Sequence, residues 1–67
     1  MPHKCTFVGF VCDLEYIDEH SNTYPAVGDI VVLNNREWLV KEIEYEDNNV
    51  DVLVMVVDPY LEEIEKP

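Results

Sequence analysis

The sequence is poor in positive charge. Its only basic residues besides two histidines are Lys4, Arg36, Lys41 and Lys66, against fifteen Asp and Glu residues, and the net charge is −11. Direct binding to nucleic acid or to an anionic membrane depends on Lys and Arg that neutralise phosphates, so both classes of binding protein are disfavoured. Charge of one sign at this density favours solubility and rapid association with basic surfaces. The composition therefore indicates another protein with a basic surface as the partner.

Long apolar segments and closely placed cysteines are also lacking. The most apolar stretch, residues 50–57, is far shorter than the ~18 residues of a membrane span, and no signal-peptide pattern opens the chain. Cys5 and Cys12 are the only cysteines, in a segment that alternates like one strand. Their backbones would then lie roughly 20 Å apart, beyond disulfide reach. Free thiols are typical of a reducing compartment, so we expect a cytoplasmic protein, in the host cytoplasm if it is viral.

Patterns that carry catalysis or metal binding are missing as well. His3, Cys5, Cys12 and His20 are residue types that suit zinc, but their spacing is not that of a zinc finger or ribbon. His20 and Ser21 are adjacent in sequence, whereas a catalytic triad needs a base that is oriented by a third group. We expect a protein that is not an enzyme and that uses neither a metal nor another cofactor.

What the sequence does contain is enough apolar residues for a small folded domain. Hydrophobic residues make up 48% of the 67 positions, too many for a disordered chain. A chain of this length forms one domain, here residues 1–67, and buries only about 60% of its unfolded surface. An elaborate internal cavity is therefore not expected.

Alternation of apolar and polar residues predicts the first strand over residues 6–17. One face would carry Val8, Phe10, Cys12, Leu14 and Tyr16. Gly9 is placed where a bulge would let this long strand bend. Residues 18–25 are polar and rich in turn-forming types, which predicts an exposed loop.

Two further strands are predicted on either side of a tight turn. One follows Gly28 as far as Leu33, and Asn34-Asn35 tolerates the positive φ angles of a two-residue hairpin. The next covers residues 37–45, where the apolar positions change parity. A bulge near Lys41-Glu42 is expected to bring four residues to the same side, namely Trp38, Val40, Ile43 and Tyr45. Trp38 is expected to fill the core.

The last strand is predicted over residues 50–57, after a turn at 46–49. It ends at Asp58-Pro59 because proline does not continue a central ladder. Asp58 is a suitable N-cap and Pro59 a suitable first residue for a short helical turn, which would contain Tyr60, Leu61 and Ile64.

The predicted elements give an all-β fold. The stretch VGDIVVLNNREWLVKEIEY, followed by VDVLVMVV, resembles the central hairpins of SH3-like small barrels: a Gly-Asp before a strand, a tight turn, a Trp-x-Val strand and a final valine-rich strand. The resemblance covers about half of the chain. Together with the predicted elements, it implies a small barrel of four or five antiparallel strands with a short C-terminal helical turn. The acidic-aromatic groove of signalling SH3 domains has no counterpart here, so no polyproline-binding residues are carried over.

Two acidic clusters are candidates for partner binding. The first contains Asp13, Glu15, Asp18 and Glu19, and the second contains Glu42, Glu44, Glu46 and Asp47, with Asp51 joining it across the turn. One interpretation is a solvated surface. The other is a surface directed at a basic partner, because small soluble domains usually mix both signs at a net charge of about 2–8. An array of carboxylates can also imitate the phosphates of a nucleic acid.

The strand over residues 50–57 has a second apolar face. Val50, Val52, Val54 and Val56 share one face, whereas Leu53, Met55 and Val57 lie on the other. Either the C-terminal Tyr60, Leu61 and Ile64 cover this second face, or it is exposed as a contact surface. Leu53 and Met55, with Tyr24 from the polar loop, are the candidate apolar contact residues.

These features favour a non-enzymatic acidic protein that docks on a basic surface of another protein. In size and charge it is similar to the compact inhibitors, some of them nucleic-acid mimics, that bacteriophages and mobile elements use against host nucleic-acid enzymes. The alternative is a structural or assembly module that forms a homodimer, or packs into a larger complex, through the apolar face of strand 50–57.

Overall fold

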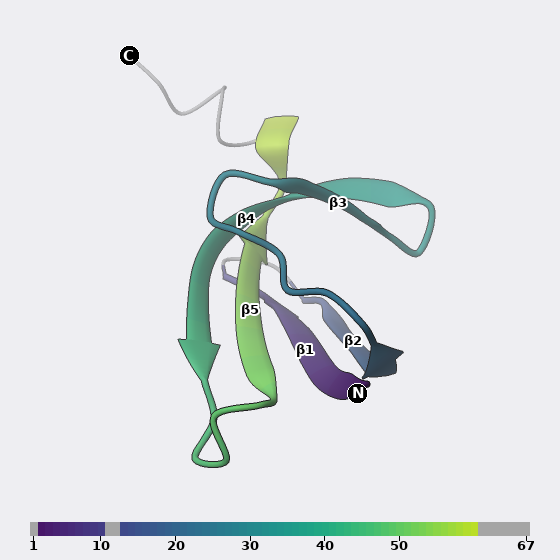
Figure 1. The fold of residues 1–67 in the computed structure, drawn as a ribbon. Coiled ribbons are helices and arrows are strands. Elements are labelled where there is room, and N and C mark those ends of the chain that lie inside the picture. Colours follow the sequence, from purple (N-terminus) through teal and green to yellow (C-terminus); the bar gives the residue numbers. More distant parts are fainter. Residues whose placement is uncertain (1, 11–12, 61–67) are drawn as a thin grey trace.

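The chain folds into a single curled β-sheet. The computed structural model describes residues 2–10 and 13–60. They form five strands, listed in chain order as β1 (His3–Gly9), β2 (Glu15–Ser21), β3 (Ile30–Leu33), β4 (Arg36–Tyr45) and β5 (Val52–Val57). The strand order in the sheet is β2-β1-β5-β4-β3, and the sheet curls into a half-barrel (Figure 1). The expected all-β class is confirmed, and the shape is compatible with an SH3-like barrel.

One pairing differs from the expected antiparallel arrangement. The pairs β1–β2, β3–β4 and β4–β5 are antiparallel, but β1 and β5 run parallel in the centre of the sheet. Both strands contribute buried residues to the core, Cys5 and Phe7 from β1 and Val52, Val54 and Val56 from β5. Their separation in sequence supplies the long connection that a parallel pair requires.

The prediction of one strand over residues 6–17 is wrong. This stretch contains the end of β1 and the start of β2, and the Gly9 N–H donates to the Leu14 carbonyl at 3.0 Å where the chain reverses. The strand β2 also continues to Ser21, so only the second half of the predicted loop 18–25 lies outside a strand. Cys12 lies outside the described residues, and Cys5 is buried and has a free thiol. The alternation of apolar and polar residues continues across the reversal. For this reason the pattern does not reveal that the chain changes direction.

The hairpin of β3 and β4 confirms the predicted turn and bulge. Asn34 and Asn35 have φ angles of 54° and 65°, as a two-residue turn of this kind requires. The register between β4 and β5 shifts between Val40 and Glu42, and as a result Val40 and Ile43 both lie opposite core valines, Val56 and Val54. The extra residue keeps the apolar side chains of the long strand on one face.

The core lies on the concave side of the sheet. Val52, Val54 and Val56 have no exposed surface. Around them pack Cys5, Phe7, Leu33, Trp38 and Val40. Trp38 is buried as predicted, and its indole N–H donates to the Leu33 carbonyl at 3.3 Å. This side of the sheet is the inner face.

The chain leaves β5 as predicted at Asp58-Pro59. Residues 59–60 are helical, and the Asp58 carboxylate accepts a hydrogen bond from the Tyr60 N–H at 2.9 Å, the geometry of an N-cap. The Tyr60 hydroxyl donates to the Glu37 carboxylate at 3.3 Å, at the start of β4 just after the β3–β4 turn. Leu61 and Ile64 lie outside the described residues. Within the described ranges, no helix has the length and apolarity needed to cross a membrane.

Candidate functional site

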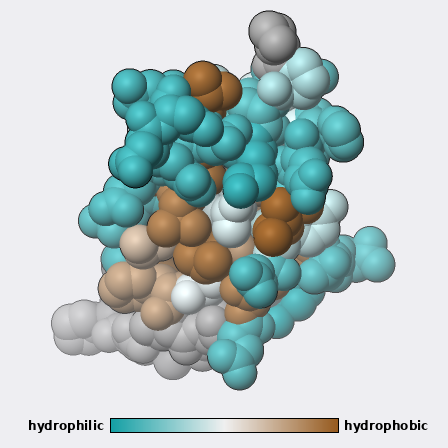
Figure 2. All heavy atoms as spheres, turned by 90° about the horizontal axis from the view of Figure 1, so that it is seen from below, coloured by the Kyte–Doolittle hydropathy of each residue, from teal (hydrophilic) through white to brown (hydrophobic). Residues whose placement is uncertain are grey.

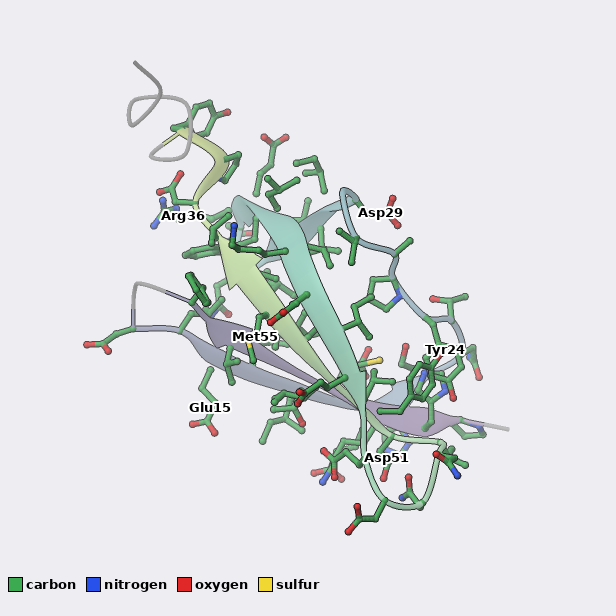
Figure 3. The ribbon with its side chains drawn as sticks, turned by 90° about the vertical axis from the view of Figure 1, so that its left-hand side faces the viewer. Glu15, Tyr24, Asp29, Arg36, Asp51 and Met55 are labelled. Atoms are coloured by element: carbon green, nitrogen blue, oxygen red, sulfur yellow. The ribbon has the colours of Figure 1, made fainter. Side chains whose placement is uncertain are left out.

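The convex side of the sheet carries a row of apolar side chains from neighbouring strands. In the β1–β5 register, Thr6 lies beside Leu53 and Val8 beside Met55, and Ile17 of β2 lies opposite Thr6. Side chains of neighbouring paired residues point to the same side of a sheet. We call this surface, made of Thr6, Val8, Ile17, Leu53 and Met55, the outer face. Figure 3 places Met55 and Glu15 on one side of the sheet and Tyr24 and Asp29 on the other.

The outer face is accessible. Leu53 and Met55 are half-buried, and Ile17 is 49% exposed. Beyond Val8, Phe10 is 52% exposed, and the Lys41 ammonium lies 5.6 Å from the centre of its ring. Seen from below, apolar side chains gather in the middle of the molecule, with hydrophilic ones above them and to the right (Figure 2).

Carboxylates flank this apolar row. On β4, Glu42 lies directly opposite Met55 and Glu44 lies opposite Leu53, while Glu15 of β2 lies opposite Val8. All three glutamates are exposed. Because residues two apart along a strand are about 6.7 Å apart on one face, Glu42 and Glu44 form a short row of negative charge beside the apolar residues.

The second acidic cluster meets the outer face at a shallow hollow. This hollow, of about 240 Å³, is lined by Glu44, Tyr45, Glu46, Asp47 and Leu53. Glu46 and Asp47 belong to the turn between β4 and β5, where the Glu46 N–H donates to the Asp51 carbonyl at 2.9 Å. The structure thus brings three predicted acids next to one predicted apolar contact residue.

The first predicted acidic cluster is divided between the two sides of the sheet. Glu15 reaches the outer face, and Asp13 and Glu19 are exposed. Asp18 is half-buried and pairs in register with Cys5 of the inner face, and its carboxylate accepts a hydrogen bond from the His20 N–H at 3.1 Å. The division follows from the strand β2, which sends successive side chains to opposite sides.

Two of the predicted contact residues have local structural partners. The Asp51 carboxylate accepts hydrogen bonds from the Lys4 N–H at 2.8 Å and from the Asn48 side-chain amide at 2.9 Å, which joins the β4–β5 turn to β1. The Tyr24 ring stacks on His3 with 3.9 Å between ring centres, and its hydroxyl donates to the Val50 carbonyl at 2.6 Å. Tyr24 is 43% exposed but lies on the inner side, away from Leu53 and Met55.

Substituting Asp51 tests this structural role. The hydrogen bond from the Lys4 N–H, with that from Asn48, lowers the pKa of Asp51 below its ordinary value of 3.8. A lowered folded-state pKa stabilises the fold above the unfolded-state pKa, and this contribution disappears as the pH falls through the folded-state value. Asp51→Asn is therefore expected to melt at a lower temperature than the natural protein at pH 7.

The difference between the two melting temperatures should begin to shrink below about pH 4 and disappear as the pH falls through the lowered folded-state pKa of Asp51, because a protonated Asp51 is neutral like the asparagine that replaces it. Circular dichroism melts of both proteins between pH 2.5 and 7 measure it. Glu46→Gln, in the same turn, is the control. A constant difference over this range would show that the Asp51 charge does not stabilise the turn.

The residues considered as zinc ligands or nucleophiles make structural contacts instead. His3 is buried, and its Nε2 donates to the Thr23 carbonyl at 3.0 Å. Burial raises the pKa of the Cys5 thiol, which disfavours the reactive thiolate. Among residues 2–10 and 13–60, no group of three or more His, Cys, Asp or Glu side chains is arranged to hold a metal ion.

The sequence pattern does not reveal Ile17 and Val8 as members of the outer face. Val8 had been placed on the same side as Tyr16, but the register pairs Tyr16 with Phe7 of the core and Val8 with Glu15. A turn signal within residues 10–14 would have separated the two strands. The sequence gives only a weak one, from Gly9 just before this stretch and Asp13 within it.

Comparison of the chain with models of known protein families, with curated proteins and with solved structures finds no match.

Proposed function

We propose that this protein is a non-enzymatic binding protein whose outer face docks on another protein, at an apolar site surrounded by Lys and Arg. The observation that carries the proposal is the placement of Leu53 and Met55, half-buried in the middle of the sheet, directly opposite the exposed Glu44 and Glu42. Accessible apolar residues bordered by charge are typical of contact surfaces. The net charge of −11 selects a basic partner.

The two components of this surface have different roles in binding. Carboxylates attract a basic partner over long distances and raise the association rate, an effect that salt screens. Apolar side chains that lose contact with water on docking slow the dissociation. The row of Glu42 and Glu44 continues at the turn with Glu46 and Asp47, which gives the surface an extended line of negative charge. A partner that binds the phosphates of nucleic acid presents the matching basic groove.

An affinity capture with matched variants tests the proposal. The tagged protein, Met55→Asp and the double variant Glu42→Lys/Glu44→Lys are each incubated with nuclease-treated lysate of the cells in which the protein functions. Val27→Lys in the segment 22–29 is the charge control, because Val27 is 65% exposed and is not part of the outer face. We expect one protein to be captured by the natural chain and by Val27→Lys, and lost with both outer-face variants.

The kinetics of the captured protein complete the test. Glu42→Lys/Glu44→Lys should lower the association rate and flatten its salt dependence, whereas Met55→Asp should mainly raise the dissociation rate. Capture that is equal for all variants, or absent for the natural chain, would contradict the proposal.

The alternative occupant of the outer face is a second copy of the chain. The continuity of Ile17, Thr6 and Leu53 across three strands favours this possibility, whereas the net charge of −11 on each copy opposes it. Sedimentation equilibrium distinguishes the two. A dimer that persists at low salt and dissociates in Met55→Asp would replace the proposed partner by self-association.

A further inference from the structure

The half-barrel has an open seam between its two edge strands. In the order β2-β1-β5-β4-β3, the strands β2 and β3 lie at opposite ends of the sheet. Residues 22–29 join them and pass in front of β5 (Figure 1). A pocket of about 390 Å³ lies at this seam, and its lining includes Tyr16 and Asp18 of β2, all four residues of β3, and Phe7 of the core. The seam is on the inner side, opposite the outer face.

The free edge of β3 offers backbone hydrogen-bonding groups. Leu33 and Arg36 flank a two-residue turn and so form a hydrogen-bonded pair, and such pairs alternate along an antiparallel ladder. The bond from the Val40 N–H to the Asp29 carbonyl, at 2.9 Å, continues this alternation. It follows that the N–H and C=O groups of Ile30 and Val32 point away from β4, toward the free edge.

The strand β3 contains neither a Lys nor a Pro that would protect this edge. Natural edge strands usually carry a Lys, a Pro or a bulge that discourages pairing with another chain. The strand Ile30–Leu33 reads IVVL, and its side chains at Ile30 and Val32 are 50% and 67% exposed. These residues have high strand propensity and are accessible, so the edge is suited to accept another strand.

The negative charge of the pocket favours a basic ligand. Among the described residues of its lining, the charged ones are Asp18 and Asp29, and none is a Lys, Arg or His. Each aspartate uses one carboxylate oxygen in a local hydrogen bond, Asp18 with the His20 N–H and Asp29 with the Ala26 N–H. Phe7 and Leu33 contribute an apolar floor. A second copy of this acidic chain is disfavoured there by its own charge of −11.

We propose that the seam binds an extended basic segment of another protein, which pairs with the free edge of β3 and extends the sheet. The backbone of the segment bonds to Ile30 and Val32, its apolar side chains contact the floor, and its Lys or Arg side chains lie near Asp18 and Asp29. Addition of a strand to an exposed sheet edge is a common mode of peptide recognition. This site does not depend on the outer face.

The experiment uses an acetylated and amidated hexapeptide of alternating Lys and Val, added to the ¹⁵N-labelled full chain and followed by amide chemical shifts. We expect saturable shifts concentrated in β3 and β2. A Glu-Val peptide of equal length should not bind. A Lys-Val peptide with every backbone nitrogen of its six residues methylated should lose binding as well, because it keeps the charge but has no backbone donor on either edge of those residues.

Variants of the protein locate the site. Val32→Pro removes an N–H that points to the free edge and leaves the β3–β4 ladder intact. It should therefore abolish the chemical-shift changes, whereas the control Val32→Thr should retain them. Asp18→Asn/Asp29→Asn should raise the dissociation constant about three- to tenfold. Met55→Asp on the outer face should leave binding unchanged, which separates this inference from the proposed function.

Several results would overturn the inference. These are shifts confined to the outer face, equal binding of the Glu-Val peptide, unaltered binding of the N-methylated peptide, or no saturable shifts at millimolar peptide. Shifts of β3 amides that depend on protein concentration without peptide would show that a second copy occupies the edge. If Val32→Pro does not fold, the N-methylated peptide still decides the role of the backbone.

Discussion

Val54→Asp is expected to yield a chain that does not fold, whereas Met55→Asp, one residue further, is expected to fold. Val54 has no exposed surface, and its neighbours across the sheet are Phe7 and Ile43. An unpaired carboxylate in such surroundings costs about 5 kcal/mol or more. A protein of 67 residues has a total stability of about 3–10 kcal/mol. The substitution therefore removes most or all of the stability.

Met55 points to the outer face, and the aspartate that replaces it remains in contact with water. The expected cost is about 1–2 kcal/mol, from lost apolar contact and from repulsion by Glu42 directly opposite. Amide spectra of the two purified variants, with urea unfolding of the one that folds, measure the difference. Equal losses of structure in both variants would mean that the two sides of β5 do not differ in burial as described.

Trp38→Ala is expected to lower the free energy of unfolding by about 3–5 kcal/mol. The side chain is 5% exposed, and it fills the concave side between β3 and β5. Its loss leaves a cavity that the short sheet has few residues to fill, and it also removes the donor to the Leu33 carbonyl. The Arg36 guanidinium, 4.7 Å from the centre of the indole ring, would lose a packing surface as well.

Tyr60→Ala is the matched aromatic control, because Tyr60 is 63% exposed and its hydroxyl donates one exposed hydrogen bond to the Glu37 carboxylate at 3.3 Å. Its expected cost is about 0.5 kcal/mol or less. Urea unfolding followed by far-UV circular dichroism compares both variants without relying on tryptophan fluorescence. Similar unfolding midpoints for the two would contradict the central position of Trp38 in the core.

The β3–β4–β5 half of the molecule could be predicted in detail because local rules specify it. Asn34-Asn35 fixes a two-residue turn, and that turn fixes the register of the strands on either side. The change of parity between Val40 and Ile43 requires a bulge, since one side of β4 has to face the core. The alternation of β5 indicated the burial of Val52, Val54 and Val56, although Val57, assigned to the other face, is buried as well.

The other half was predicted less well. Residues 6–17 alternate throughout, and two strands joined by a reversal give the same pattern as one long strand. The error put Val8 and Tyr16 on one side, although they lie on opposite sides of the sheet. It also hid the contribution of Ile17 to the candidate site.

By itself, the sequence determined the all-β class, the hairpin, the bulge, the core valines and the excess of negative charge. Only the tertiary structure decided that β1 lies parallel to β5, that Glu42 and Glu44 border an apolar row from three strands, and that an open seam separates β2 from β3. The physical reason is the range of the interactions. Turn conformation and side-chain alternation depend on adjacent residues, whereas the choice of neighbouring strands depends on how the whole chain encloses one core.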